Sequence, residues 1–135
     1  MKKVFYSSHL AKLLRYAHTI TIGPFILTKR KKLDQSVINH ECVHVRQWAE
    51  LTLANWFIMW LLSLMINLST WWFILPVVVF YLWYGAEYLI RLAILKTHKE
   101  AYRAISFEQE ARLAENDENY LENSRYFSWI KFLNK

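Results

Sequence analysis

Two long apolar stretches dominate the middle of the chain. They cover residues 51–68 and 71–95, and the only candidate turn between them is Asn67-Leu68-Ser69-Thr70. Eighteen residues span roughly 27 Å as an α-helix, which is just enough for the hydrocarbon core of a thin bilayer. We therefore expect a transmembrane helical hairpin over residues 51–95. The alternative is a hairpin that enters the membrane without crossing it.

A more polar helix is expected to lead directly into the first apolar stretch. Asp34 is a suitable N-cap residue, and no Gly or Pro interrupts the chain from residue 35 to residue 75. Residues 35–50 therefore predict a helix that continues into the first span.

The two flanks of this region have different patterns. Residues 8–17 predict a basic amphipathic helix, either on a membrane surface or packed on the protein. Residues 18–28 are β-like and are broken by Gly23-Pro24, which predicts a small hairpin or one kinked strand. Residues 97–115 predict another helix. The aromatic segment 126–133 is expected to dock on the membrane or on the protein.

These elements predict one all-α integral membrane domain with a two-helix transmembrane hairpin, flanking amphipathic helices and one short β-hairpin. Its expected parts are an interfacial segment (1–34), a motif helix (35–50), the hairpin (51–95) and cytoplasmic helices (96–135).

Composition and charge agree with a membrane protein. The chain is 55% hydrophobic, and its two Gly and two Pro leave little turn chemistry for an all-β fold. The net charge is +6, yet Lys and Arg are absent from residues 47–90, and Glu87 is the only carboxylate in residues 51–99. A bilayer imposes such segregation, whereas a nucleic-acid-binding face would not. The positive-inside rule places both basic termini on the cytoplasmic side of the inner membrane.

A His-Glu-x-x-His pentad, residues 40–44, stands just before the first apolar stretch. On a helix, residues four apart share a face, so His40 and His44 can bind one zinc ion. Glu41 beside them can take a proton from a water molecule that zinc activates. Gln47 and Glu50 continue the polar face of the same helix, which makes Gln47 a candidate neighbour of the metal ligands.

A catalytic zinc site needs a third protein ligand and one open position. The apolar face of helix 97–115 is formed by Ala101, Ala104, Ile105 and Ala111. At about 100° per residue, Glu108 falls on that face, whereas Glu110 points away from it. We predict that Glu108 is the third ligand, with Glu115 as the second choice. The alternative is that Glu108 pairs with Arg103 or Arg112.

One ion pair is expected within the second apolar stretch. Glu87 and Arg91 are four residues apart, in the favourable order for a helix. Either the pair reaches the membrane interface, which we favour, or Glu87 makes a buried polar contact to the active site.

The pentad, the hairpin and Glu108-Gln109-Glu110-Ala111 together resemble the membrane gluzincins. These are the HtpX-type and CAAX-prenyl-protease-type zinc metallopeptidases and the BlaR/MecR-type sensor peptidases, and the resemblance covers roughly residues 35–115. It implies that Glu108, which opens the second motif, is the third zinc ligand. The sequence is also similar to small membrane proteins of Bacteroidetes, through the Ala-Tyr-Arg-x-Ile-Ser-Phe-Glu-x-Glu-Ala stretch at residues 101–111.

Two features depart from that family. Arg112 stands where the family usually has an Asp that supports a histidine ligand, so this support must come from elsewhere. The chain is also much shorter than typical members.

The expected function is a zinc-dependent membrane endopeptidase acting on membrane or membrane-proximal polypeptides. Tyr102, Tyr120 and Arg125 are candidate donors to the substrate carbonyl, and residues 18–28 could offer an edge strand to an extended substrate. The rival is a non-enzymatic small membrane subunit or adaptor with a structural metal site. The short chain and Arg112 favour this rival, and Glu41 disfavours it.

Overall fold

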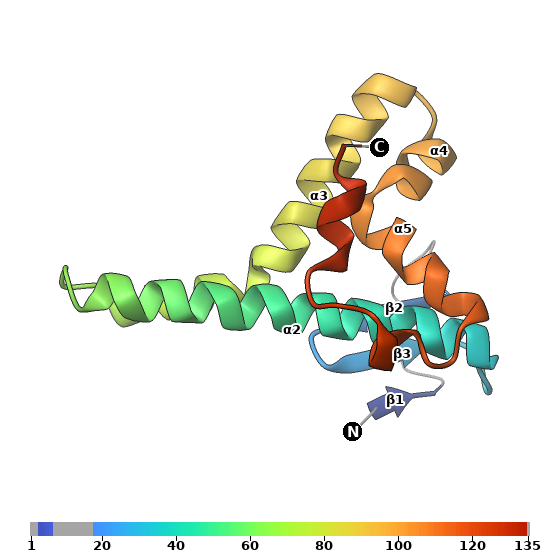
Figure 1. The fold of residues 1–135 in the computed structure, drawn as a ribbon, viewed down its shortest axis with the longest axis horizontal. Coiled ribbons are helices and arrows are strands. Elements are labelled where there is room, and N and C mark those ends of the chain that lie inside the picture. Colours follow the sequence, from blue (N-terminus) through green and yellow to red (C-terminus); the bar gives the residue numbers. More distant parts are fainter. Residues whose placement is uncertain (1–2, 7–17, 135) are drawn as a thin grey trace.

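The computed structural model describes residues 3–6 and 18–134, and it is mostly helical with one small sheet (Figure 1). The amphipathic helix expected at residues 8–17 lies outside the described residues. The helices are α2 (Gln35–Ser63), η1 (Thr70–Ile74), α3 (Leu75–Leu95), α4 (His98–Ala104), α5 (Ser106–Leu113), η2 (Ala114–Asn116), α6 (Tyr120–Asn123) and η3 (Ser128–Phe132).

The sheet has three strands, in the order β1-β3-β2. Strands β2 (Thr19–Ile22) and β3 (Phe25–Thr28) form an antiparallel hairpin, which decides between the two predictions for this segment. Gly23 has a φ of +55° at the turn, a conformation that glycine adopts without steric cost. Strand β1 (Lys3–Phe5) pairs in parallel with β3 and was not predicted. The described fold is therefore helical with a small sheet rather than all-α.

Helix α2 runs unbroken from the motif region into the first apolar stretch, as predicted. Asp34 occupies the N-cap position, although its side chain makes no capping hydrogen bond. The first half of α2 is buried and carries polar side chains. From Leu53 onward, large apolar side chains are exposed.

Helix α3 returns along α2 only over its first half. The indole nitrogen of Trp48 donates to the carbonyl of Val77, and that of Trp56 donates to the carbonyl of Phe73. Each hydrogen bond is 2.9 Å long. Further along, α3 leaves α2 and packs against α4 (Figure 1). The segments Gln35–Met65 and Thr70–Leu95 are both long and apolar enough to cross a membrane, by length and composition.

The helix predicted over residues 97–115 is interrupted. Ile105 is extended, with φ −61° and ψ 131°, and it separates α4 from α5. Glu110 is nevertheless only 1% exposed, because α5 is buried on several sides and the Glu110 carboxylate accepts hydrogen bonds from Arg46 and Gln47 of α2. The expectation that Glu110 lies on the outer side of this helix, away from the apolar face, is therefore wrong.

The C-terminal aromatic segment docks on the protein. Trp129 and Phe132 are buried, and the Trp129 ring lies 4.6 Å from the Phe107 ring, centroid to centroid. Together with Leu51, Phe80 and Ile105, Phe107 and Trp129 form a hydrophobic core that joins α2, α3 and α5. This core fixes α5 against the motif region of α2.

Candidate metal centre

Helices α2 and α5 bring three metal-ligating side chains together. His40 and His44 lie one turn apart on α2, and their Nε2 atoms are 3.2 Å from each other. Glu108, on the first turn of α5, places Oε2 3.4 Å from His40 Nε2 and Oε1 3.2 Å from His44 Nε2. These are the three residues that the sequence predicts as zinc ligands.

Their spacing fits one tetrahedral metal ion. Ligand atoms that lie 2.0–2.2 Å from a tetrahedral zinc are about 3.3–3.6 Å apart from each other. The three measured separations, 3.2–3.4 Å, are close to that range and longer than a charge-assisted hydrogen bond. The three groups are thus already arranged around a common point.

The orientation of the His44 ring is set by Gln47. The Gln47 amide nitrogen donates to Phe107 O (3.1 Å) and to Glu110 Oε2 (2.9 Å), so its Oε1 is the atom that faces His44 Nδ1 at 2.8 Å. An amide oxygen only accepts, and we therefore assign the ring proton to Nδ1. In the neutral ring, this leaves the lone pair on Nε2, directed towards Glu108.

The His40 ring is held in the same way by Glu115. The Nδ1 atom of His40 lies 2.8 Å from Glu115 Oε1, and an ionised carboxylate accepts the proton that Nδ1 carries. Glu115, the second choice for third ligand, is thus a neighbour that orients a ligand. It gives the His40 ring the carboxylate contact that metal-binding histidines ordinarily have.

Two imidazole lone pairs and a carboxylate therefore converge on one point. Glu108 is 2% exposed, and its Oε2 makes no well-formed hydrogen bond within the described residues. Burial alone would raise the pKa of Glu108, but hydrogen bonds and positive charge from the His40 and His44 rings, when these carry a proton on Nε2, outweigh burial and hold this pKa well below its usual range. When both rings are neutral, the three converging electron-pair donors repel each other unless a cation lies between them, so the donor set fits a bound zinc ion.

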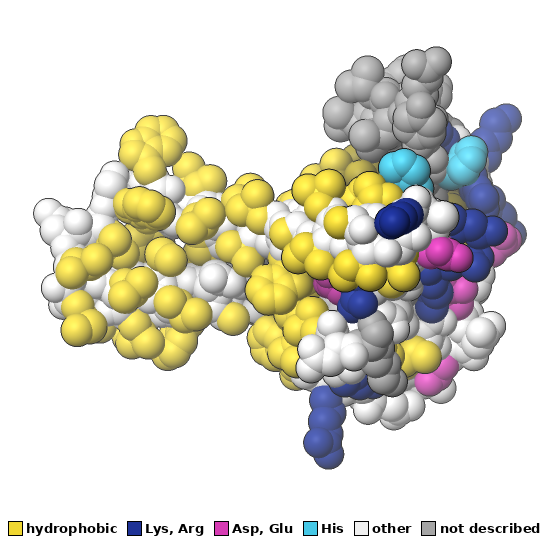
Figure 2. All heavy atoms as spheres, turned by 90° about the horizontal axis from the view of Figure 1, so that it is seen from above, with side chains coloured by type: hydrophobic (Ala, Val, Ile, Leu, Met, Phe, Trp, Pro, Cys, Tyr) yellow, Lys and Arg dark blue, Asp and Glu magenta, His cyan; other side chains and the backbone are white. Residues whose placement is uncertain are grey.

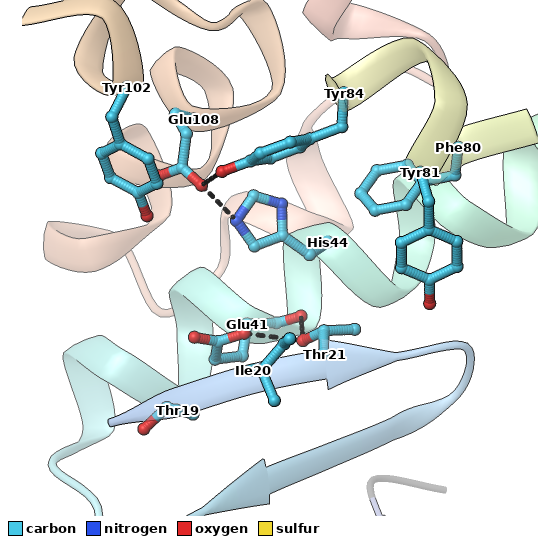
Figure 3. Close-up of a pocket in the computed structure, with 10 residues that line it drawn as sticks. All are labelled: Thr19, Ile20, Thr21, Glu41, His44, Phe80, Tyr81, Tyr84, Tyr102 and Glu108. Carbon is cyan, nitrogen blue, oxygen red and sulfur yellow. Dashed lines mark hydrogen bonds and ion pairs between the residues drawn. The ribbon is translucent and has the colours of Figure 1, made fainter. Parts of the chain in front are cut away.

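A cavity of about 290 Å³ adjoins this centre (Figure 3). It is lined by Thr19, Ile20, Thr21, Glu41, His44, Phe80, Tyr81, Tyr84, Tyr102 and Glu108. Glu41 lies between α2 and β2, where its Oε2 accepts a 2.6 Å hydrogen bond from Thr21 Oγ1. The general-base candidate and two of the three candidate ligands thus share one cavity.

The three candidate carbonyl donors have different positions. Tyr102 lines the cavity, and burial together with the Glu108 carboxylate raises its pKa, so its hydroxyl keeps its proton. Tyr120 instead bonds to Glu110 Oε1 (3.3 Å); burial, together with that carboxylate, raises the pKa of Tyr120 to about 12. Arg125 is exposed and does not line the cavity. Only Tyr102 is brought to the site.

The alternative partners for Glu108 are not used. Arg112 donates to the Arg103 carbonyl (3.3 Å), and its guanidinium lies over the Tyr102 ring. Arg46 instead makes a buried ion pair with Glu110, at 2.9 Å.

Glu87 does not reach out to an interface as we favoured. It is 8% exposed and accepts hydrogen bonds from Ser106, while Arg91 lies 3.6 Å away. The prediction that this pair reaches the membrane interface is therefore wrong for Glu87. Its side chain points into the protein, towards the helix that carries Glu108.

Two further contacts at the centre were not predicted. Tyr84 donates to Glu108 Oε1 over 2.8 Å, and Thr21 holds Glu41. A signal for Tyr84 existed in the sequence, because Tyr81, Tyr84, Glu87 and Tyr88 form a polar stripe at helical spacing within an apolar stretch. Thr21 had no comparable signal, since its partner lies on another element.

Comparison with known proteins finds no match to the chain among family models, curated proteins or solved structures.

Proposed function

We propose that this protein is a zinc-dependent membrane endopeptidase that hydrolyses peptide bonds of membrane or membrane-proximal polypeptides. The observation that carries the proposal is the convergence of His40, His44 and Glu108 next to a cavity that also contains Glu41. A site built only to hold a structural metal has no use for the cavity or for an anchored carboxylate within it.

The residues divide into two roles. His40, His44 and Glu108 would hold the metal, and a bound zinc ion supplies the Lewis acidity that acidifies a water molecule and polarises a carbonyl. Glu41 is a general base that accepts a proton from the attacking water and passes it to the leaving amine. Its hydrogen bond from Thr21 occupies one carboxylate oxygen and holds the side chain at the cavity wall.

The cavity also has groups suited to an extended peptide. Residues Thr19–Thr21 of β2 line one wall, and β2 is an edge strand within the described sheet. An extended substrate can pair with such an edge through its backbone. Tyr102, whose hydroxyl stays protonated, is the candidate donor to the substrate carbonyl.

An apolar arm supports the membrane location. We define the arm as residues 51–80. Its exposed large apolar side chains are Leu53, Trp56, Phe57, Ile58, Trp60, Leu61, Leu62, Leu64, Met65, Ile66, Trp71, Trp72, Ile74 and Val78. The arm contains no charged residue, and Figure 2 shows the charged side chains gathered away from it. A surface of this size without charge favours lipid as its surroundings.

The rest of α3, residues 81–95, continues this apolar surface. Its exposed large side chains are Leu82, Trp83, Leu89, Ile90, Ile94 and Leu95. We propose that the bilayer contacts the arm and this stripe, with the metal centre and both termini on the cytoplasmic side of the inner membrane.

A purified full-length protein in detergent tests the proposal. The measurements are zinc content and cleavage of β-casein, for wild type, Glu41→Gln and the matched exposed control Glu122→Gln. We expect one zinc per chain in all three and cleavage in wild type and the control only. Casein cleavage that persists in Glu41→Gln contradicts the assigned role. A wild type that holds zinc but cleaves nothing favours the structural-metal rival.

A further inference from the structure

Glu87 is a buried carboxylate on α3, and it accepts two hydrogen bonds from one residue of α5. Its Oε1 accepts a hydrogen bond of 2.8 Å from the Ser106 backbone N–H, and its Oε2 accepts one of 2.7 Å from the Ser106 hydroxyl. Both oxygens of one carboxylate are therefore committed to a single residue, the first of α5.

This contact supplies α5 with the cap that its own sequence lacks. The N-cap position is occupied by Ile105, whose side chain cannot accept a hydrogen bond, and the first N–H groups of a helix have no partner within that helix. A carboxylate at a helix N-terminus also interacts favourably with the helix dipole. Glu87 thus performs, from a different helix, the role usually played by a Ser or Asp before the first turn.

The same face of α3 also holds the third ligand directly. Tyr84 lies three residues before Glu87, and residues three apart share a helix face. Its hydroxyl donates to Glu108 Oε1 over 2.8 Å, and Glu108 lies two residues after Ser106. Helix α3 therefore fixes both the start of α5 and the carboxylate that α5 presents to the histidines.

Glu87 is in turn held by its surroundings. Arg91 Nη2 lies 3.6 Å from Glu87 Oε1 and donates to Leu133 O over 3.0 Å. The Phe107 side chain, between Ser106 and Glu108, is fully buried in the core. The start of α5 is thus fastened on two sides, by a capped N-terminus and by a packed aromatic ring.

We propose that Glu87 is a positioning residue for the metal centre: by capping α5, it sets the place of Glu108 relative to His40 and His44. This inference rests on the proposed zinc site. It adds that metal affinity depends on a carboxylate that does not itself touch the ligands, and that the membrane-facing helix α3 controls the third ligand.

The test is zinc affinity of the full-length protein in detergent, measured by competition with a chromophoric chelator. Removing a group that contacts a metal ligand typically weakens metal binding about 10–100-fold, and Glu87, which acts on Glu108 through α5, should have an effect at the lower end of that range. For Glu87→Gln we expect a Kd for zinc about tenfold higher than wild type, and an altered visible absorption spectrum of the Co²⁺-loaded protein. The matched control Glu122→Gln, at an exposed position, should retain both wild-type values.

A second variant separates positioning from general folding. Ser106→Ala removes only the hydroxyl bond to Glu87, so it should raise the Kd by less, and the double variant should be no weaker than Glu87→Gln alone. A wild-type Kd and a wild-type Co²⁺ spectrum in Glu87→Gln would overturn the inference, whatever its melting temperature. If Glu87→Gln fails to fold, a wild-type Kd in Ser106→Ala overturns it. A wild type that binds no zinc removes the proposed site itself.

Discussion

Gln47 orients His44 by a hydrogen bond of 2.8 Å between its Oε1 and the ring Nδ1. The amide can serve in only one orientation, because its nitrogen is committed to Phe107 O and Glu110 Oε2. The fully buried Gln47 thus transmits the position of α5 to a ring on α2. The same helix that supplies Glu108 therefore also determines which nitrogen of His44 faces it.

Gln47→Leu should lower zinc affinity about tenfold, because the His44 ring loses the contact that fixes its tautomer and orientation. Stability should fall as well, since Glu110 Oε2 and Phe107 O each lose a buried donor. Chelator competition and thermal melting measure the two effects. Gln35→Leu, at an exposed position on the same helix, is the control. Equal affinity in Gln47→Leu and wild type would exclude the orienting role.

Glu115 should be as important to His40 as Gln47 is to His44. Glu115→Ala is expected to weaken zinc binding by about 10–100-fold, and Glu115→Gln by less, because an amide oxygen can still accept the Nδ1 proton. Glu118→Ala, at a nearby exposed position, should have no effect. The readout is again the Kd for zinc. An unchanged Kd in Glu115→Ala would mean that His40 needs no support from this carboxylate.

The convergence of His40, His44 and Glu108 was predictable because each part carries a local signal. His40, Glu41 and His44 follow from spacing on one helix, and Glu108 from a carboxylate on the apolar face of another. The prediction for Glu110 failed because the helical wheel assumed that only one face of the helix is covered, whereas α5 is buried on several sides and Glu110 bonds to Arg46 and Gln47 of α2. The extended residue Ile105 also divides the helix predicted over residues 97–115, and a one-residue break of this kind leaves no clear mark in the sequence.

The hydrogen bonds that hold the site residues in place were less predictable, because their partners lie on other elements. Thr21–Glu41, Tyr84–Glu108 and Glu87–Ser106 each join elements far apart in the chain. Periodicity indicates which face of a helix is polar, but it does not indicate which residue on another element that face meets. The parallel pairing of β1 with β3 was missed on the same ground.

The two tyrosines named from the sequence should differ in function. Tyr102 lines the cavity, so Tyr102→Phe should lower kcat for casein cleavage by about a hundredfold while zinc content stays at one per chain. Tyr120 bonds to Glu110 and lies under Arg46, away from the cavity, so Tyr120→Phe should leave kcat near wild type. Steady-state kinetics decide the matter. A larger loss of kcat in Tyr120→Phe than in Tyr102→Phe would contradict the assignment of Tyr102 as the carbonyl donor.

The membrane orientation can be tested with spin labels on single cysteines in a Cys42→Ala background. Labels at Leu61 on the arm and Leu89 on the α3 stripe should collide often with oxygen and seldom with a water-soluble nickel chelate, because lipid surrounds both sites. A label at Tyr126, which is 76% exposed, should collide freely with nickel. Power-saturation measurements in lipid vesicles give both rates. Free access of nickel to Leu61 would contradict insertion of the arm.

The central claim is that His40, His44 and Glu108 hold one zinc ion, and X-ray absorption spectroscopy of the purified full-length protein tests it most directly. We predict one zinc per chain with a shell of nitrogen and oxygen atoms at about 2.0–2.2 Å and the outer scattering of two imidazole rings. Glu108→Ala should bind zinc more than about a hundredfold more weakly, since a lost ligand costs more than a lost outer contact. A protein that takes up no zinc, or whose zinc spectrum lacks imidazole scattering, would contradict the account.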